Sequence, residues 1–333
     1  MINLFFYSFF ISLITLLIVI FVAHKHTLFI DHNDEKKPQN FHAHSTPRAG
    51  GIGILAGISL LILMPLGLKF IFSIFLAFLS GIFEDFHNSL TPKLRLFLQL
   101  IAAIVVVWLT HSVVTYLGLG ISMPYWLGTF FTIFAIVGMM NAINIIDGFN
   151  GLASGVILFI LISFALVSYH QHNEEMLSII SIVSGATFGF FVLNFPKGKI
   201  FLGDGGAYML GFIVAVIGIF LASKYEDVSP WYVLAIFIYP VWEVIFSIIR
   251  KSYIGHSPMQ PDSYHLHMLI YRQITKNNPL TTVFILLAIL PSNVLSTLYS
   301  NSSIYNIYIA TTFICCYLLL YRYLYKKDIA TLK

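Results

Sequence analysis

Charged residues are scarce in this 333-residue chain. Asp, Glu, Lys and Arg together make up 10% of it, whereas an average globular domain contains about 25%. Hydrophobic residues make up 58%, and the mean hydropathy is +0.87. So little charge excludes an ordinary soluble domain. The composition instead predicts a polytopic membrane protein.

Cysteine is nearly absent as well. The two cysteines, Cys315 and Cys316, are adjacent within an apolar run, which argues against both a disulfide framework and a zinc site. The first apolar run, residues 4–23, has no basic residue before it and no small-residue cleavage site after it. We therefore expect a retained membrane helix there rather than a signal peptide.

Long apolar runs follow one another through the whole chain. A membrane-spanning helix needs about 20 mostly apolar residues. By this rule we expect an all-α transmembrane bundle of about eleven spans, forming a single domain over residues 1–333. The expected spans are residues 3–23, 49–67, 70–84, 94–110, 125–142, 152–169, 176–193, 207–222, 231–249, 280–297 and 303–321.

Basic residues are unevenly distributed among the loops that these spans define. Cytoplasmic loops are enriched in Lys and Arg near the helix ends. If the N-terminus lies outside, only Lys69 and Lys224 of the eighteen Lys and Arg fall outside. We therefore predict an N-out, C-in topology. The sixteen residues expected inside are Lys25, Lys36, Lys37, Arg48, Lys93, Arg95, Lys197, Lys199, Arg250, Lys251, Arg272, Lys276, Arg322, Lys326, Lys327 and Lys333.

Unusual polar clusters occur in the predicted cytoplasmic loops and at the helix ends that border them. The first contains Glu84 and Asp85 at the end of one apolar run, and Lys93 and Arg95 at the start of the next. Two carboxylates at a membrane boundary are costly unless they have a partner. Cations at a helix start oppose the helix dipole. The cluster either solvates helix ends or binds an anion such as phosphate.

A polar stripe ends the fifth expected span. Asn141, Asn144, Asp147 and Asn150 recur at every third residue, so on a helix they form a slowly drifting polar line. Such side chains are costly in contact with lipid. The stripe therefore indicates either hydrogen bonds between helices or, in the interpretation that we favour, the wall of a water-filled site.

A glycine-rich segment, Gly203-Asp204-Gly205-Gly206, precedes another apolar run. Glycines let the backbone approach a ligand closely, and a helix N-terminus favours anions. Mg²⁺ in proteins usually takes one or two carboxylates together with substrate phosphates. Asp204 could hold Mg²⁺ against a phosphate in this way, and the alternative is a simple turn.

Histidines mark two further loops. His265 and His267 lie in the longest predicted cytoplasmic loop, and a His-x-His pair cannot share one helical face as the ligands of a helical zinc site do. The two imidazoles could instead donate to a diphosphate, or be incidental. Upstream, His42 and His44 lead to Arg48, which either binds phosphate or only follows the positive-inside rule.

In their order along the chain, these clusters resemble the motifs of the polyprenyl-phosphate N-acetylhexosamine-1-phosphate transferases, the MraY/WecA superfamily within glycosyltransferase family 4. The resemblance is strongest over residues 31–272. The form of the histidine motif, SPxxPDxxHxH, is similar to that of the WecA-like branch. The segments that carry the resemblance are KPQNFHAHSTPRAGG, GIFEDFHNSLTPKLRL, NAINIIDGFNGLASG, KIFLGDGGAYMLGF and SPMQPDSYHLHML.

The resemblance implies a bundle of ten or eleven helices in the bacterial inner membrane, with its active site facing the cytoplasm. It implies that undecaprenyl phosphate displaces UMP from a UDP-N-acetylhexosamine such as UDP-N-acetylglucosamine, with Mg²⁺ as cofactor and Mn²⁺ as a substitute. The product would initiate a cell-surface glycan such as the O-antigen of lipopolysaccharide. The implied partners are the lipid phosphate, the UDP-sugar and the bilayer, without nucleic acid, and a homodimer is one expected oligomeric state.

Roles for single residues follow from their positions in these motifs. Asp204 and Asp147 match acidic positions expected to hold the metal, and Asp85 either orients or deprotonates the lipid phosphate. The expected catalytic residues are Glu84, Asp85, Asp147 and Asp204. The expected substrate-binding residues are Arg48, Lys93, Arg95, Asn144, Asn150, His265 and His267.

Three positions depart from the pattern of the family. Glu84 stands where Asp is usual, Asn150 replaces an Asp, and Met268 replaces a further His. The main rival interpretation is an ion-coupled transporter, because broken helices with Asn and Asp also line transport sites. Those sites lie near the bilayer midplane, however, whereas these clusters lie at one interface. A structural scaffold would leave Asp147 and Asp204 unexplained.

Overall fold

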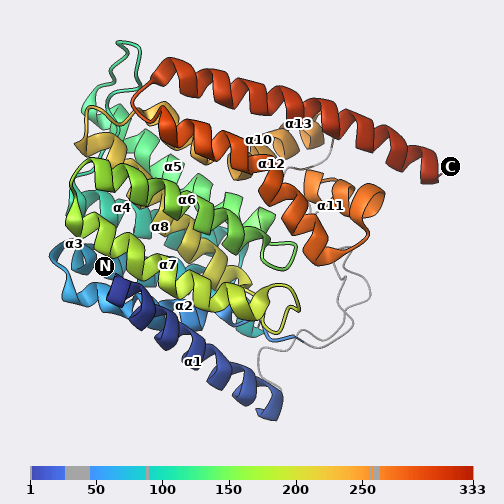
Figure 1. Cartoon of the computed structure of the whole chain (residues 1–333), viewed down its shortest axis with the longest axis horizontal. Coiled ribbons are helices and arrows are strands. Elements are labelled where there is room, and N and C mark those ends of the chain that lie inside the picture. Colours follow the sequence, from blue (N-terminus) through green and yellow to red (C-terminus); the bar gives the residue numbers. More distant parts are fainter. Residues whose placement is uncertain (1, 27–45, 88–89, 256, 258–262, 333) are drawn as a thin grey trace.

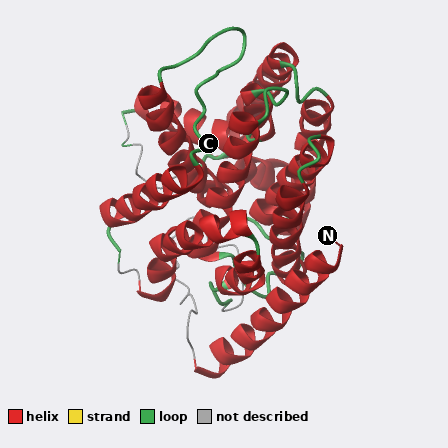
Figure 2. Ribbon diagram, turned by 90° about the vertical axis from the view of Figure 1, so that its left-hand side faces the viewer, coloured by secondary structure: helices red, strands yellow, loops and turns green. Residues whose placement is uncertain are grey.

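The computed structural model describes residues 2–26, 46–87, 90–255, 257 and 263–332. His42 and His44 of the first predicted motif, and residues 258–262 of the histidine motif, lie outside the described residues. Within them, two isolated β-bridges accompany an otherwise all-helical chain (Figure 2). The predicted all-α polytopic membrane fold is confirmed.

Nine described helices are long and apolar enough to cross a membrane, and a bent pair forms a tenth candidate span. The bent pair is α9 (Pro230–Ile236) and α10 (Ile238–Tyr253), which meet at 76° where the sequence predicted a single span over residues 231–249. The nine are α1 (Ile2–His26), α3 (Pro65–His87), α4 (Pro92–Thr110), α5 (Tyr125–Ile146), α6 (Leu152–His170), α7 (Glu174–Asn194), α8 (Gly203–Lys224), α12 (Asn278–Leu298) and α13 (Ser303–Leu332).

The span expected at residues 49–67 is shorter than predicted. Here α2 (Gly50–Ile58) tightens into the 3₁₀-helix η1 (Ser59–Leu63), and Pro65 then begins α3. With rises of about 1.5 Å and 2.0 Å per residue for the two helix types, the pair reaches about 24 Å, less than the roughly 30 Å of a hydrocarbon core. The proline favours a new helix start because it has no N–H to donate backwards.

Contacts between distant segments fix the relative directions of helices, and the parallel pair α1 and α7 agrees with spans that alternate in direction along the chain. Hydrogen bonds from Ser8 to Ile182 and from Ser12 to Ala186 make α1 parallel to α7. The starts of α2 and α8 and the ends of α3 and α5 consequently lie together at one end of the bundle, which carries Arg48, Asp85, Asp147 and Asp204; we call this the site end. Alternation is what the predicted topology requires.

Helix α8 forms the centre of the bundle. Nearly every residue from Gly203 to Leu221 is buried, and α2, α3, α5 and α6 all pack against it. By contrast, α1 and α13 lie at opposite edges of the bundle (Figure 1). A helix that is apolar on every side suits such a central position. The N-terminus of α8 is thereby held in the middle of the site end.

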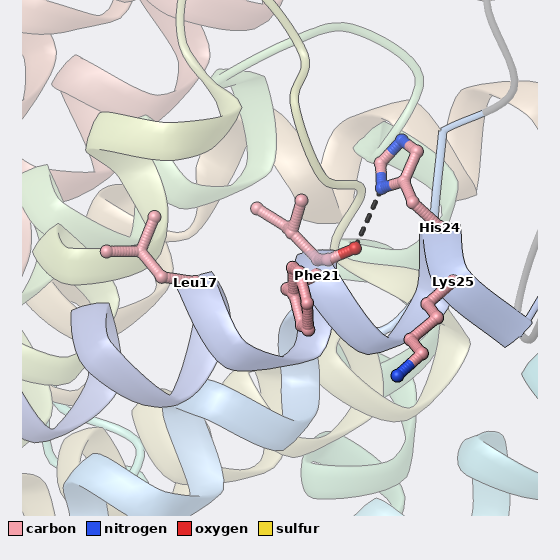
Figure 3. A pocket seen from close by; sticks show the side chains of 5 residues that line it. Leu17, Phe21, His24 and Lys25 are labelled. Atoms are coloured by element: carbon pink, nitrogen blue, oxygen red, sulfur yellow. Dashed lines mark hydrogen bonds between the residues drawn. The ribbon is translucent and has the colours of Figure 1, made fainter.

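The outer face of α1 shows where the hydrocarbon environment ends. A shallow groove there is lined by Leu17, Ile20, Phe21, His24 and Lys25 (Figure 3). Nδ1 of His24 donates to the carbonyl oxygen of Ile20 at 2.7 Å. The change from exposed apolar to basic side chains within two turns is typical of a lipid-to-headgroup boundary. This groove therefore belongs to the lipid-facing surface.

Candidate functional site

The glycine-rich segment at the start of α8 is held by a carboxylate from another helix. Oδ1 of Asp85, at the end of α3, accepts a hydrogen bond from the N–H of Asp204 at 2.8 Å, and Oδ2 accepts one from the N–H of Gly205 at 3.0 Å. Asp85 thus satisfies two of the N–H groups that a helix start leaves without partners.

Two glycines make this approach of α3 to α8 possible. A Cβ added to Gly81 would lie 2.3 Å from the backbone nitrogen of Gly205, and one added to Gly203 would lie 2.7 Å from Oδ2 of Asp85. Gly203 also has a φ of +76°, a conformation that side chains with a Cβ rarely adopt. The contact between the acidic pair and the glycine-rich segment therefore depends on glycine at both places.

The side chain of Asp204 is held from two helices. Nη1 of Arg95, in the first turns of α4, donates to Oδ2 at 3.0 Å, and Nδ2 of Asn144, in α5, donates to Oδ1 at 3.0 Å. Helix α4 begins at Thr91-Pro92, where the threonine caps the N–H of Leu94. Three of the predicted clusters therefore converge on one carboxylate.

Arg48 reaches the site because its segment pairs with the strand-like residues before α8. The N–H of Gly50 donates to the carbonyl of Phe201 at 2.8 Å, and the N–H of Phe201 donates to the carbonyl of Pro47 at 2.9 Å. Arg48 and Phe201 form a parallel bridge. The guanidinium acts electrostatically on the charges of both Asp85 and Asp147. Arg48 is thus a second cation, beside Arg95, among the site carboxylates.

Asp147 directly follows the last residue of α5 and is half-buried. Burial, with a smaller contribution from the negative charge of Asp204, raises the pKa of the Asp147 carboxyl to about 7, although Arg48 opposes the rise. A carboxyl in this position is only partly ionised at neutral pH. A cation that arrived at the site would favour its ionised form.

The asparagines of the polar stripe in and after α5 make different contacts. Asn141, in α5, donates to Oε1 of Gln99, in α4, at 2.8 Å. This is a hydrogen bond between helices, one of the two interpretations of the stripe. Asn144 contacts Asp204, as described above. Asn150 is buried, and its Nδ2 donates to the carbonyl of Pro196 at 3.0 Å, so it ties the loop after α5 to the loop before α8. Its expected role in substrate binding stays a prediction.

The histidine motif lies against the same loop. The rings of His265 and His267 are parallel, with centroids 5.3 Å apart, and the ring of His267 meets Phe149 edge-on at 5.8 Å. A Cβ on Gly148 would lie 3.5 Å from Nε2 of His267. His267 therefore borders the loop that begins at Asp147. Both rings turn Nδ1 toward the buried carboxylate of Glu243.

Two predicted residues are less closely connected to this cluster. Lys93 is exposed at the start of α4, on the same end of the bundle as Arg95, and its proposed phosphate contact is untested. Glu84 precedes Asp85, and among the described residues its buried Oε2 has no hydrogen-bond partner. A buried carboxylate oxygen without a donor is costly, and the expected catalytic role of Glu84 stays a prediction.

The residues suit a cation that is also held by its substrate. The described part of the chain contains no group of three or more His, Cys, Asp or Glu that could hold a metal alone. Asp204 and Asp147 offer carboxylate oxygens, the donors that Mg²⁺ prefers, and Mg²⁺ commonly completes its shell with phosphate oxygens and water. The residues thus fit Mg²⁺ bound together with a diphosphate, and they do not fit a metal site built by protein alone.

Sequence reasoning missed Glu243, Asn194 and Gly81. Asn194 is buried, accepts from the N–H of Gly151 at 2.5 Å and donates to the carbonyl of Ile200 at 2.7 Å. Glu243 could have been noticed, because an acidic residue inside an expected span is a functional candidate. Nothing in the sequence distinguishes Gly81 from the other glycines in apolar runs.

This geometry defines a class of protein: an all-helical membrane bundle with carboxylates, amides and arginines gathered at one end. Sequence comparison identifies the class more closely, because a profile described as "Glycosyl transferase family 4" matches residues 68–222. That range contains the acidic pair, the stripe of α5 and the start of α8, but neither Arg48 nor the histidine motif.

Curated relatives extend the similarity beyond that range. The chain is 31% identical over 261 residues to an undecaprenyl-phosphate alpha-N-acetylglucosaminyl 1-phosphate transferase of Thermotoga maritima, covering 78% of each chain. It is 28% identical over 279 residues to a probable undecaprenyl-phosphate N-acetylglucosaminyl 1-phosphate transferase of Bacillus subtilis, covering 78% of this chain and 75% of the relative. The chain belongs to glycosyl transferase family 4.

Other relatives match a shorter region. A phospho-N-acetylmuramoyl-pentapeptide-transferase of Streptococcus agalactiae is 34% identical over 182 residues, which are 53% of this chain and 52% of that protein. The chain thus spans about half the length of such relatives. The predicted resemblance to the MraY/WecA superfamily is confirmed.

Proposed function

We propose that this protein transfers a sugar 1-phosphate from a UDP-N-acetylhexosamine to undecaprenyl phosphate and releases UMP. The observation that carries the proposal is the position of Asp204, which is held at the start of α8 between Arg95 and Asn144, with Asp85 and Asp147 nearby. Both reactants are phosphate anions, and they need cations and fixed donors around them.

The proposed reaction exchanges one diphosphate bond for another. An oxygen of the lipid phosphate attacks the β-phosphorus of the UDP-sugar, and the bond from that phosphorus to the oxygen bridging the two phosphates breaks. UMP leaves with this oxygen, and the lipid carries the new diphosphate linkage to the sugar. Such a reaction depends mainly on positioning and on neutralising charge. Arg48 and Arg95 supply positive charge at the site.

We propose that Asp204 and Asp147 hold Mg²⁺, with Mn²⁺ as a substitute. When bound, the metal neutralises negative charge on the diphosphate and on the leaving phosphate. Asn144 and Arg95 fix the orientation of the Asp204 carboxylate, so its oxygens stay in place whether or not substrate is present.

For Asp85, the hydrogen bonds favour orientation over deprotonation. Each of its oxygens already accepts a backbone N–H of α8. A lipid phosphate has a second pKa near 6, by analogy with phosphorylated side chains, so it is largely ionised at neutral pH without a strong base. We propose that Asp85 fixes the segment carrying Asp204 and does not act as a base on the lipid phosphate.

The relatives favour N-acetylglucosamine as the sugar. The two that are named for N-acetylglucosaminyl transfer share about three quarters of their length with this chain, against about half for the one named for muramoyl-pentapeptide transfer. We propose UDP-N-acetylglucosamine or a related UDP-N-acetylhexosamine as donor. The product would begin a surface glycan such as O-antigen, with the site end on the cytoplasmic face of the bacterial inner membrane.

Purified protein in detergent, supplied with Mg²⁺, undecaprenyl phosphate and a panel of UDP-sugars, tests the proposal. UMP release should require the lipid and should fall roughly 100-fold or more in Asp204→Asn, in line with the loss of one central electrostatic group. Asp227→Asn, a matched change in the loop between α8 and α9 at the far end of the bundle, should be silent. No UMP from any UDP-sugar, with uptake of a substrate by proteoliposomes, would favour a transporter.

A further inference from the structure

The histidine motif is anchored by an acidic residue that is buried inside the bundle. Glu243, in α10, is 1% exposed. Its Oε2 lies 3.1 Å from Nδ1 of His265, and its Oε1 accepts from the N–H of Leu266 at 3.1 Å. Nδ1 of His267 lies 3.9 Å from Oε1. One carboxylate therefore contacts both ends of the His-x-His segment and its backbone.

The bend between α9 and α10 brings Glu243 to this place. On α10 the buried polar residues Tyr239, Glu243, Ser247 and Lys251 recur at every fourth position, so they share one face of the helix. Helix α10 also packs against α5. The hydroxyl of Tyr239 lies 3.3 Å from Nδ1 of His267. Both imidazoles thus find polar partners for Nδ1 on this one face of α10.

Contacts at Nδ1 decide what the opposite ring nitrogen does. When Nδ1–H donates to a carboxylate, the ring orientation is fixed and Nε2 lies on the far side of the imidazole. For His267 that far side is next to Gly148, beside Asp147. Since Nδ1 is the ring nitrogen nearest Glu243 in both His265 and His267, both rings present Nε2 away from Glu243.

A structural explanation of Glu243 is weaker than a functional one. A fully buried ion pair is costly, because the desolvation of the charges offsets much of their attraction. An apolar residue at position 243 would avoid that cost, and among the described residues the only backbone group that would lose its acceptor is the N–H of Leu266. A carboxylate in this position is explained if it orients groups that act on a ligand.

We propose that Glu243 is a positioning residue that acts through His265 and His267, fixing both imidazoles so that Nε2 meets the diphosphate of the nucleotide sugar. This inference rests on the proposed function. It assigns Glu243, together with Tyr239, to the nucleotide side of the site and not to the lipid side. Its effect should therefore appear in the Michaelis constant for one substrate only.

The test compares Glu243→Gln with wild-type protein in steady-state kinetics and in thermal unfolding with and without UDP. Glutamine keeps an acceptor for the N–H of Leu266 but lacks the charge that fixes the imidazoles. KM for the UDP-sugar should rise roughly 10- to 100-fold, the loss expected for hydrogen bonds that involve a charge, while KM for undecaprenyl phosphate stays the same. UDP should raise the unfolding midpoint of the wild type and much less that of the variant.

Further variants distinguish positioning from folding. In a His265→Ala background, Glu243→Gln should raise KM by a smaller factor than in wild type, because only the contribution through His267 remains to be lost. Tyr239→Phe removes one contact of His267 without leaving a buried charge, and it should raise the same KM by less. Glu175→Gln is the matched control: Glu175 also accepts a backbone N–H, that of Leu66 at 2.7 Å, but at the opposite end of the bundle.

The possible failures are distinct. If wild-type protein releases no UMP from any UDP-sugar, the proposed function is wrong and Glu243 loses its assigned role with it. If wild-type protein is active and Glu243→Gln keeps the wild-type KM for the UDP-sugar, or raises both KM values equally, the positioning role is wrong while the function stands. Should Glu243→Gln fail to fold, an unchanged KM in Tyr239→Phe would overturn the role.

Discussion

At the scale of single residues, the carboxylates of the site differ in how well the surrounding donors satisfy them. Asp204 has both carboxylate oxygens held by donors, whereas Glu84 keeps a buried oxygen without one. Asp147 is held partly neutral by burial. Such arrangements are costly for folding and are typical of functional sites. Stability and activity should therefore respond in opposite directions when the charge of Asp147 is removed.

Asp147→Asn tests this opposition through pH. The folded-state pKa of Asp147 is raised from 3.8 to about 7, so between these values the folded chain binds more protons than the unfolded chain. The free energy of unfolding must then fall as pH rises through that window. Without Mg²⁺, Asp147→Asn should raise the unfolding midpoint at pH 8 and much less at pH 5, while abolishing transfer. A variant less stable than wild type at pH 8 would contradict this account of Asp147.

At the scale of helices, the site depends on how closely α3 approaches the start of α8. Gly81 permits that approach, because even one methyl group would overlap the backbone at Asp204 and Gly205. Gly81→Ala should therefore separate Asp85 from the start of α8 and lower transfer activity at least tenfold, with a loss of about 1–3 kcal/mol in stability from overpacking. The control is Gly138→Ala, in α5, where an added Cβ meets nothing within 4 Å. Full activity in Gly81→Ala would show that the contact is dispensable.

Sequence patterns predict some of these elements better than others. Apolar length predicts the nine long helices well, because each run needs only enough residues to cross the hydrocarbon. It does not predict that the run at 49–67 divides at Pro65, nor that the run at 231–249 bends by 76°, because both depend on packing against α3, α7 and α13. The bend matters most, since it places Glu243 behind the histidines.

The candidate site, too, has some contacts that the sequence predicts and others that it does not. The order and chemistry of the motifs predict that Arg95, Asn144 and Asp204 belong to one site, and the structure brings these three into direct contact. The capping of α8 by Asp85 and the tie between Asn150 and Pro196 could not be predicted. They are contacts to backbone atoms, which leave no pattern in the side chains.

At the scale of the whole molecule, the alternating helices place thirteen described Lys and Arg at or near the site end, against Lys69 and Lys224 at the other. The positive-inside rule then predicts that the site end faces the cytoplasm. In a variant with Cys315 and Cys316 replaced, a single cysteine at Glu226 should react with a membrane-impermeant maleimide in spheroplasts of intact inner membrane. One at Lys326 should react only after lysis. The reverse pattern would invert the topology.

The central claim is that a phosphate moves together with the sugar. It is tested most directly with a UDP-sugar that carries radioactive phosphorus only in its β-phosphate, incubated with the protein, Mg²⁺ and undecaprenyl phosphate. Transfer of a sugar 1-phosphate places the label in the lipid fraction and leaves unlabelled UMP in water, and Asp204→Asn should prevent this. If the sugar reaches the lipid while the label remains in water as UDP, the protein transfers the sugar alone, and the account given for Asp204 and Asp147 is wrong.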